Sequence, residues 1–496
     1  MRAGEQEIEL KFAVAPELGE TIMSRPEFAD RVVSRRLVST YFDSAEHALL
    51  RAGYTLRVRH EDGRWVQTLK SCVSGDGAVR DEWSLPIRRG APELSLLPCK
   101  AAIDAMVGEA AVAMFSVDVE RRSIALDAPG CQVEVSLDNG SVNHAGRSAP
   151  IRELELELRA GRRAAFFAFA RSFRDRYGLR PAFVSKAARG FELCAGALGG
   201  ARRFGPPPVS ADMTAGEAFK AAARAALTQI AQNAELLRTT SATPPHDVEV
   251  VHQLRVGLRR LRSLIRAFRP IVGDGRARII RDRLKGVASD VASAREADVL
   301  LTGAFAQARW GAADASRATF ARRLRAARKA AYDRARAAVD DDAFSALLLE
   351  TIVWIEGGPW TASRAAGAAG RDAPIGPFAT RSLESGYRRV LRRGRRFNSL
   401  DPEARHALRI AAKTLRYSAD VFGPLFEDHP KRRRRFTVHI KMALDAMGEL
   451  NDLVSTPPWC ETWPGPILAW RASRQSLAAT AGAKALRGLA KTKPFW

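Results

Sequence analysis

Charged and apolar residues alternate along one segment after another in the first 193 residues. Within 6–14, Glu7, Glu9 and Lys11 alternate with apolar residues. The same alternation recurs at 54–59, 65–70, 80–87, 132–138 and 151–158. Successive side chains of a β-strand point to opposite faces, so each segment predicts a strand with one charged face and one apolar face. If such strands close into a barrel, one set of faces must line the interior, and a charged interior needs compensation from its own charges or from a ligand.

The residue types on these faces favour a phosphate ligand and a divalent metal. Arg57 and Arg59 share one face, whereas Glu153, Glu155 and Glu157 share another. Guanidinium groups bind phosphate oxygens, and clustered carboxylates suit a hard cation such as Mg²⁺ or Mn²⁺. For any single segment the alternative is a surface strand with solvated charges. The repetition over several segments favours the charged interior.

The composition changes near residue 195. Residues 196–212 are rich in Gly, Ala and Pro, which predicts a linker, and the following sequence has helical periodicity. Residues 1–200 hold 28 basic and 27 acidic residues, whereas residues 201–496 hold 51 and 28. We therefore expect a multidomain α+β protein with a balanced domain at 1–195 and a strongly basic helical domain at 213–496. A net charge of +23 in the second part attracts polyanions.

The helical region contains an internal repeat of basic residues, divided by an irregular stretch at 357–377. His252, Arg255, Arg259 and Arg262 recur at a constant offset of 154 as His406, Arg409, Lys413 and Arg416. This repeat predicts two halves, about 213–356 and 378–496. At 100° per residue, the first set and Arg266 form a narrow basic ridge on a helix, opposite a leucine-rich stripe. Neighbouring like charges repel, and a bound anion would remove that repulsion.

The N-terminal domain resembles the CYTH, or triphosphate tunnel metalloenzyme, family. The resemblance covers about residues 3–195 and rests on Glu7-x-Glu9-x-Lys11, Leu56-Arg57-Val-Arg59, Thr68-Leu-Lys70, Glu153-Leu-Glu155-Leu-Glu157 and Ser185-Lys186. It implies an eight-stranded antiparallel tunnel that binds a triphosphate and a divalent metal. It also implies phosphate contacts at Lys11, Arg57, Arg59, Lys70, Arg122 and Lys186, with Glu82 in the lumen. The metal ligands that it implies are Glu7, Glu9, Asp138, Glu153, Glu155 and Glu157. Strand parity alone does not decide between Arg121 and Arg122.

The helical region resembles the CHAD domain, a pair of pseudo-symmetric four-helix bundles. The pattern His-x-x-Arg-x-x-x-Arg/Lys-x-x-Arg occurs twice, and the segments around Lys285 and Lys441 resemble a further helix of that family. The resemblance implies binding of inorganic polyphosphate. The residues expected to contact it are His252, Arg255, Arg259, Arg262, Arg266, Lys285, His406, Arg409, Lys413, Arg416 and Lys441.

Together these features predict a metal-dependent inorganic triphosphatase that uses Mg²⁺ or Mn²⁺ and also binds polyphosphate. Three alternatives stay open: adenylate cyclase or thiamine triphosphatase chemistry in the same tunnel, a non-enzymatic polyphosphate-binding protein, and a nucleic-acid binder. The basic ridges lack interleaved aromatic residues for base stacking, which argues against nucleic acid. Scattered cysteines, a charged N-terminus and the lack of a long apolar stretch predict a cytoplasmic protein without a membrane segment.

Overall fold

The computed structural model describes most of the chain, and its contacts separate into two compact units. The described residues are 5–61, 63–71, 79–97, 103, 111–196, 200–205, 207, 209–239, 246–311, 315–454, 459–460 and 462–496. The first unit contains Met1–Arg202, Leu227–Leu236 and Asp342–Gly358. The second contains Arg203–Ala226, Leu237–Asp341 and Pro359–Trp496.

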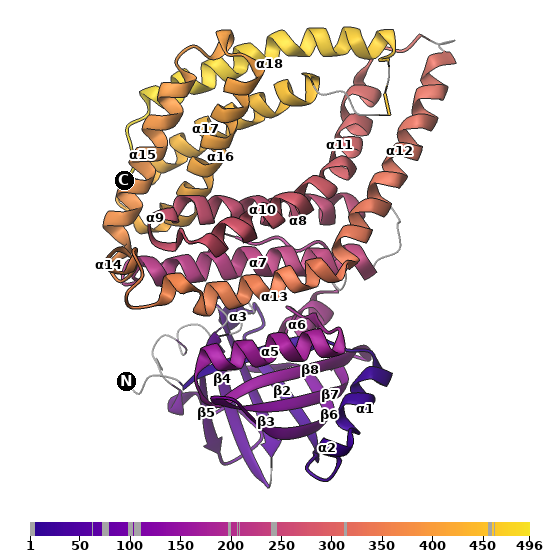
Figure 1. The fold of residues 1–496 in the computed structure, drawn as a ribbon, viewed down its shortest axis with the longest axis vertical. Coiled ribbons are helices and arrows are strands. Elements are labelled where there is room, and N and C mark those ends of the chain that lie inside the picture. The colour runs from indigo at the N-terminus through magenta and orange to yellow at the C-terminus, as the bar shows by residue number, and fades with distance from the viewer. Residues whose placement is uncertain are drawn as a thin grey trace. The chain divides into compact units, whose positions relative to one another are not determined.

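The first unit is built on an antiparallel sheet (Figure 1). Its strands pair in the order β5-β4-β3-β2-β6-β7-β8-β1-β9, and β1 also pairs with β5, so the strand order returns on itself. The bounds are β1 Glu5–Ala13, β2 Val33–Asp43, β3 Tyr54–Glu61, β4 Arg64–Ser71, β5 Val79–Ile87, β6 Val112–Ala128, β7 Cys131–His144, β8 Arg147–Gly161 and β9 Arg180–Pro181. The predicted antiparallel sheet in the N-terminal region is confirmed.

Helices and a 3-10 turn accompany the strands of the first unit. They are α1 Pro16–Met23, α2 Pro26–Ala29, α3 Ala48–Arg51, α5 Arg163–Tyr177, α6 Lys186–Ala195 and the 3-10 turn η1 Leu94–Leu96. Helices α5 and α6 contact the sheet. On β1 the residues Ile8, Leu10 and Phe12 are buried, as the alternation predicts. Helix α6 approaches the sheet closely at Gly190, where an added Cβ would lie 2.1 Å from the ring of Phe115. A larger residue at this position of α6 would therefore collide with the Phe115 ring.

The second unit is helical, as the sequence predicts. The helices of the C-terminal region are α7 Ala215–Thr239, α8 His246–Ala267, α9 Arg269–Val272, α10 Gly275–Asp290, α11 Ala292–Leu300, α12 Ala315–Asp340, α13 Asp342–Gly357, α14 Ala368–Arg371, α15 Ile375–Gly394, α16 Pro402–Phe422, α17 Pro430–Val454 and α18 Gly465–Lys491. Short turns are the π-helical η2 Leu301–Phe305 and the 3-10 turns η3 Pro359–Thr361, η4 Phe397–Ser399 and η5 Gly423–Leu425. None of the described helices is long and apolar enough to cross a bilayer.

The two repeated basic helices are α8 and α16, which contact each other. On α8 the stripe of Leu254, Leu258 and Leu261 is fully buried. On α16 the residues Leu408 and Leu415 are fully buried as well. Burial of one apolar stripe on each helix leaves the predicted basic ridge of each helix on another face.

The compact units follow the packing of apolar helices, not the order of the chain. Helix α13 is buried along much of its length, and it contacts α5 and β9 within the first unit. Arg174 of α5 is buried there, where its guanidinium contacts the Asp342 carboxylate and donates to the Leu179 carbonyl. The expected linker at 196–212 lies partly outside the described residues, at 197–199, 206 and 208. The domain boundary therefore stays a prediction.

Candidate functional site

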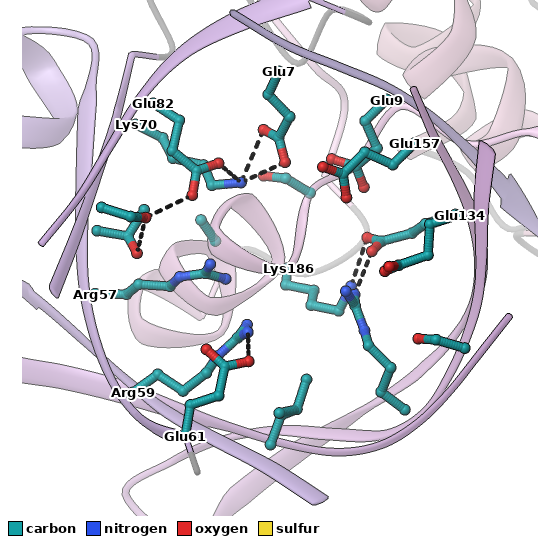
Figure 2. Close-up of a pocket in the computed structure, with 18 of the residues that line it drawn as sticks. Glu7, Glu9, Arg57, Arg59, Glu61, Lys70, Glu82, Glu134, Glu157 and Lys186 are labelled. Carbon is teal, nitrogen blue, oxygen red and sulfur yellow. Dashed lines mark hydrogen bonds and ion pairs between the residues drawn. The ribbon is translucent and has the colours of Figure 1, made fainter. Parts of the chain in front are cut away.

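A charged cavity of about 1340 Å³ lies inside the sheet of the first unit. Figure 2 shows Arg57 and Arg59 reaching in from one side, with the carboxylates of Glu9, Glu134 and Glu157 grouped on another side. Of the residues predicted for the tunnel, those in the cavity lining are Glu7, Glu9, Lys11, Arg57, Arg59, Lys70, Glu82, Glu155, Glu157 and Lys186. Their inward position agrees with the alternation of charged and apolar residues in the sequence.

Strand register explains why these side chains meet. Lys11 of β1 pairs with Glu155 of β8, and Glu9 of β1 pairs with Glu157 of β8. Glu157 also pairs with Glu134 of β7. Directly opposite residues in an antiparallel pair point to the same face of the sheet. The register therefore builds rows of charge across three strands.

The ammonium group of Lys186 contacts three buried carboxylates. Its Nζ lies 2.7 Å from Asp138 Oδ2 and 2.8 Å from Glu155 Oε1, and it also contacts the Glu153 carboxylate. Burial alone would raise the pKa of the Glu155 carboxyl, but Lys11 and Lys186 outweigh it and hold that pKa well below its usual range. Burial likewise acts against the ammonium of Lys186, but the carboxylates raise its pKa. Asp138 and Glu153 do not reach the cavity lining but lie buried among these cations.

Arg121, and not Arg122, contributes the β6 cation to the cavity. Arg121 pairs with the inward Asp138, donating from Nε to Oδ1 at 2.7 Å, and it also contacts the Glu155 carboxylate. Arg122 points to the other face, where it contacts Glu20 of α1. The expectation that Arg122 lies in the tunnel is wrong, because the register with β7 places odd-numbered residues of β6 inside.

The two arginines of β3 differ in how well their charge is compensated: burial acts against the guanidinium of Arg57, but Tyr41, Glu82 and Glu7 outweigh it and raise the pKa of Arg57. Arg59 Nε donates to Ser39 Oγ at 2.9 Å, and its Nη1 lies 3.5 Å from Glu61. Burial, followed by the charges of Arg57 and Arg121, lowers the pKa of Arg59 to about 10. The buried Nε of Arg57 has no hydrogen-bond acceptor among the described residues. This wall of the cavity therefore offers donors to an anion.

Lys70 binds two carboxylates on the next strands. Its Nζ lies 2.9 Å from Glu7 Oε2 and 2.7 Å from Glu82 Oε2. Glu82 thus lies in the lumen, as expected. In this structure, however, it compensates a cation of the cavity wall.

The carboxylates of Glu9, Glu134 and Glu157 lie on one side of the cavity (Figure 2). Arg159 contacts both Glu134 and Glu157. Burial, together with the charges of Glu7 and Glu134 and despite Arg159, raises the pKa of Glu157 to about 7. A hard divalent cation among these oxygens would relieve the crowding of like charges. Among the described residues, Asp138, Glu153 and Glu155 are the acidic group whose oxygens all lie within 4.8 Å of one another, but buried cations already neutralise them.

The structure adds charged residues that the sequence analysis missed. Arg31, Arg35, Glu61 and Arg159 also line the cavity. The parity of β8 could have indicated Arg159, which continues the row of Glu153, Glu155 and Glu157. Arg31 lies before β2 and Glu61 ends β3, whereas Arg35 lies within β2 opposite Arg121.

The second unit holds a separate basic cavity of about 710 Å³. Of the residues predicted to bind polyphosphate, those that line it are His252, Arg255, Arg259, Arg409, Lys413 and Arg416. The others do not line it: Arg262, Arg266, Lys285, His406 and Lys441. Arg262 and Arg266 are half-buried further along α8, and Lys285, His406 and Lys441 are exposed.

The cations of this cavity repel one another. Burial, followed by Arg409 and Arg259, lowers the pKa of Lys413 to about 7. Burial and Arg259 lower the pKa of Arg255 to about 10. The buried Nε atoms of Arg259, Arg409 and Arg416 have no hydrogen-bond acceptor among the described residues. Asp452 offsets part of this repulsion, so the site keeps an excess of positive charge.

Comparisons with known proteins agree with this division. Residues 5–191 match the family model of the CYTH domain, and residues 221–459 match that of the CHAD domain. An inorganic triphosphatase of Haemophilus influenzae is 29% identical over 197 residues, which cover 38% of this chain and 55% of that protein. The chain thus spans about half the length of this curated relative.

Two solved structures give weaker likenesses. The CHAD domain from the plant Ricinus communis is 22% identical, with a TM-score of 0.47, over 59% of this chain and 96% of that chain. A putative adenylate cyclase from Bacillus halodurans is 17% identical, with a TM-score of 0.30, over 38% of this chain and 98% of that chain. With both family models matched in sequence order, the chain combines a CYTH domain with a CHAD domain.

Proposed function

We propose that the cavity of the first unit hydrolyses inorganic triphosphate to pyrophosphate and phosphate with the help of Mg²⁺ or Mn²⁺. The supporting observation is the arrangement of opposite charges within one cavity: the guanidinium groups of Arg57 and Arg59 lie on one side, and the carboxylates of Glu9, Glu134 and Glu157 lie on another. A chain of phosphates fits the first, and a divalent cation fits the second. The likeness to an inorganic triphosphatase supports the same substrate.

The residues divide into two roles. Arg57 and Arg59, with Lys11, Lys70, Arg121 and Lys186, would neutralise the phosphate oxygens. Phosphoryl transfer depends mainly on such positioning and charge neutralisation. The group Glu9, Glu134 and Glu157 would hold the cation, with Glu7 and Glu155 beside it. The bound cation supplies charge neutralisation at the phosphates and lowers the pKa of water.

The reaction needs no covalent enzyme intermediate. The oxygen of a water molecule bonds to the terminal phosphorus, and the bond from that phosphorus to its bridging oxygen breaks. Pyrophosphate leaves with the bridging oxygen, and a proton of the water passes to solvent or to phosphate. Arg57 and Arg59 favour this step by neutralising the charge that builds on the departing oxygen.

A phosphate-release assay tests the proposal. The full chain should release phosphate from triphosphate in a titration of Mg²⁺ or Mn²⁺, and Arg57→Ala or Glu9→Ala should reduce turnover by at least about 100-fold. Lys285→Ala, which changes an exposed residue, is the control. A folded parent protein that releases no phosphate at any metal concentration would sink the proposal. Product analysis with ATP and thiamine triphosphate separates it from cyclase and thiamine triphosphatase activity.

We further propose that the cavity of the second unit binds inorganic polyphosphate. Five of the predicted cations line it together with His252, and three of its arginines have an Nε without a hydrogen-bond acceptor among the described residues. Calorimetric titration of long-chain polyphosphate into the Arg57→Ala, Arg59→Ala variant tests binding outside the tunnel. Arg255→Ala with Arg409→Ala should weaken that binding, and an unchanged affinity would contradict the assignment. Residence in the cytoplasm stays a prediction from the sequence.

A further inference from the structure

The basic cavity of the second unit has a second kind of wall that a phosphate chain does not use. Half-buried Trp463 and Trp470 line it together with apolar residues of α11, η2 and α17. The cations come mainly from α8 and α16, whereas the tryptophans lie just before and within α18. Inorganic polyphosphate has no apolar surface, so this wall adds nothing to its binding.

The tryptophans are held by a cluster of aromatic rings. Phe320 lies at its centre, with its ring 5.5 Å from that of Trp459 and 6.0 Å from that of Trp463. The guanidinium of Arg471 lies 4.3 Å from the centre of the Trp463 ring. Trp470 packs against the same cluster. A rigid aromatic surface of this kind binds a flat ring at little cost in conformational entropy.

The backbone next to this wall is irregular. The π-helical turn η2 interrupts the helix after α11, and Gly303 and Ala304 of that turn line the cavity. An added Cβ on Gly303 would meet no atom within 4 Å, so the cavity is open at this point. Single π-helical turns occur frequently at functional sites.

Acidic residues also line the cavity, where Asp452 acts on the charges of Arg255, Arg409 and Lys413. Helix α17 contributes Asp445, Glu449 and Asp452, whereas α8 and α16 contribute only basic residues and Tyr417. Carboxylates repel a phosphate chain, but they accept hydrogen bonds from hydroxyl and amino groups. These carboxylates can therefore accept hydrogen bonds from a ligand that carries hydroxyl or amino groups beside its phosphates, although Glu449 already contacts Arg474.

We propose that this cavity binds a nucleoside polyphosphate, with its phosphates on α8 and α16 and its base against Trp470. The inference rests on the proposed binding of polyphosphate in the same cavity, and it names a ligand class that the aromatic wall favours. The volume of about 710 Å³ is within the range of small-molecule sites. Stacking of one base on an aromatic side chain provides about 5- to 150-fold in affinity.

The experiment compares two ligands with the same number of phosphates. Adenosine 5′-tetraphosphate and inorganic tetraphosphate are titrated by calorimetry, without divalent metal, into the full chain carrying Arg57→Ala and Arg59→Ala. These substitutions weaken phosphate binding in the tunnel. The nucleotide should bind at least about 5-fold more tightly than the inorganic chain. Trp470→Leu should remove this preference and leave the affinity for inorganic tetraphosphate within about twofold.

Two further variants show whether a loss of binding by Trp470→Leu reflects misfolding. Trp470→Phe keeps a ring and should retain most of the preference, and Lys413→Met should weaken both ligands equally. Equal affinity for the two ligands, or a preference that survives Trp470→Leu, overturns this inference alone. If neither ligand nor long-chain polyphosphate binds to the folded protein, the proposed polyphosphate binding fails as well.

Discussion

A lysine in each of the two cavities has a shifted pKa, and the two shifts are in opposite directions. In the first unit, the carboxylates around Lys186 raise the pKa of its ammonium group. In the second unit, burial and neighbouring arginines lower the pKa of Lys413 to about 7. Paired strands supply both signs of charge to one face, whereas a helical ridge with a repeated basic residue supplies only one. The tunnel is therefore stabilised by its own ion pairs, and the helical cavity gains most from an anionic ligand.

Removing the central cation of the tunnel should give the largest effect. Lys186→Met leaves three buried carboxylates with less compensation, and an unpaired buried charge costs about 3–5 kcal/mol. We expect the free energy of unfolding of the first unit to fall by about that amount. Urea denaturation with hydrogen exchange of peptides from β7 and β8 measures it.

Lys285→Met is the matched control for this substitution. Lys285 is exposed on α10, so its loss should change stability by at most about 0.5 kcal/mol. A Lys186→Met protein as stable as this control would show that the acidic group does not depend on its cation. The contrast between the two cavities would then lose its basis.

Alanine substitution of two neighbouring arginines compares the inner and outer faces of β6. Arg121→Ala removes a cation from the cavity and should reduce triphosphate hydrolysis by about 100- to 1000-fold. Arg122→Ala removes a side chain that contacts Glu20 on the other face. It should leave turnover within about twofold, as measured by phosphate release. The reverse order of effects would contradict the placement of Arg121.

Near neutral pH, Lys413→Met should not lower the free energy of unfolding, whereas Lys186→Met should lower it. The pKa of this lysine is about 7 in the folded chain and about 10.4 when unfolded. Between these values the unfolded chain binds more protons, so the free energy of unfolding rises with pH from about 7 to about 10. Lys413→Met should lack this contribution and be no less stable than the parent at pH 6. Urea denaturation at pH 6 and pH 9 measures both effects.

The same substitution should weaken polyphosphate binding about tenfold, because it removes one charge-assisted contact. Binding by the parent at pH 8 should take up protons, since an anion restores the charge of Lys413. Calorimetry in two buffers of different ionisation enthalpy detects this uptake. A Lys413→Met protein that takes up as many protons would exclude Lys413 as the group that titrates.

The sequence predicted the sheet and most of the tunnel, because alternation fixes which face each side chain occupies. Parity within β6 could not choose between Arg121 and Arg122, since the choice depends on register with β7. In the helical region, periodicity predicted the buried stripes but not which ridge residues share a cavity. His406 and Lys285 belong to the right patterns, yet they lie exposed on their helices.

Long-range packing also forms one feature that no single segment of the sequence predicts. The aromatic wall joins Phe320 to Trp459, Trp463 and Trp470, which lie more than a hundred residues away in the sequence. The absence of interleaved aromatics within the basic ridges was a correct observation about each helix. It did not exclude an aromatic wall from other helices in the same cavity.

The smallest expected effect is the coupling energy of an exposed ion pair, and comparison with a buried pair shows whether burial or contact distance sets that energy. Arg122 with Glu20 and Lys186 with Asp138 are both close ion pairs, but Glu20 is 59% exposed and Asp138 is fully buried. A double-mutant cycle to alanine should give a coupling of about 1 kcal/mol or less for the first pair, because solvent screens it. The second pair should couple several times more strongly, since neither partner can be solvated when the other is lost. Equal couplings would mean that proximity alone sets the strength of these pairs, and the tunnel would then owe nothing to the exclusion of water.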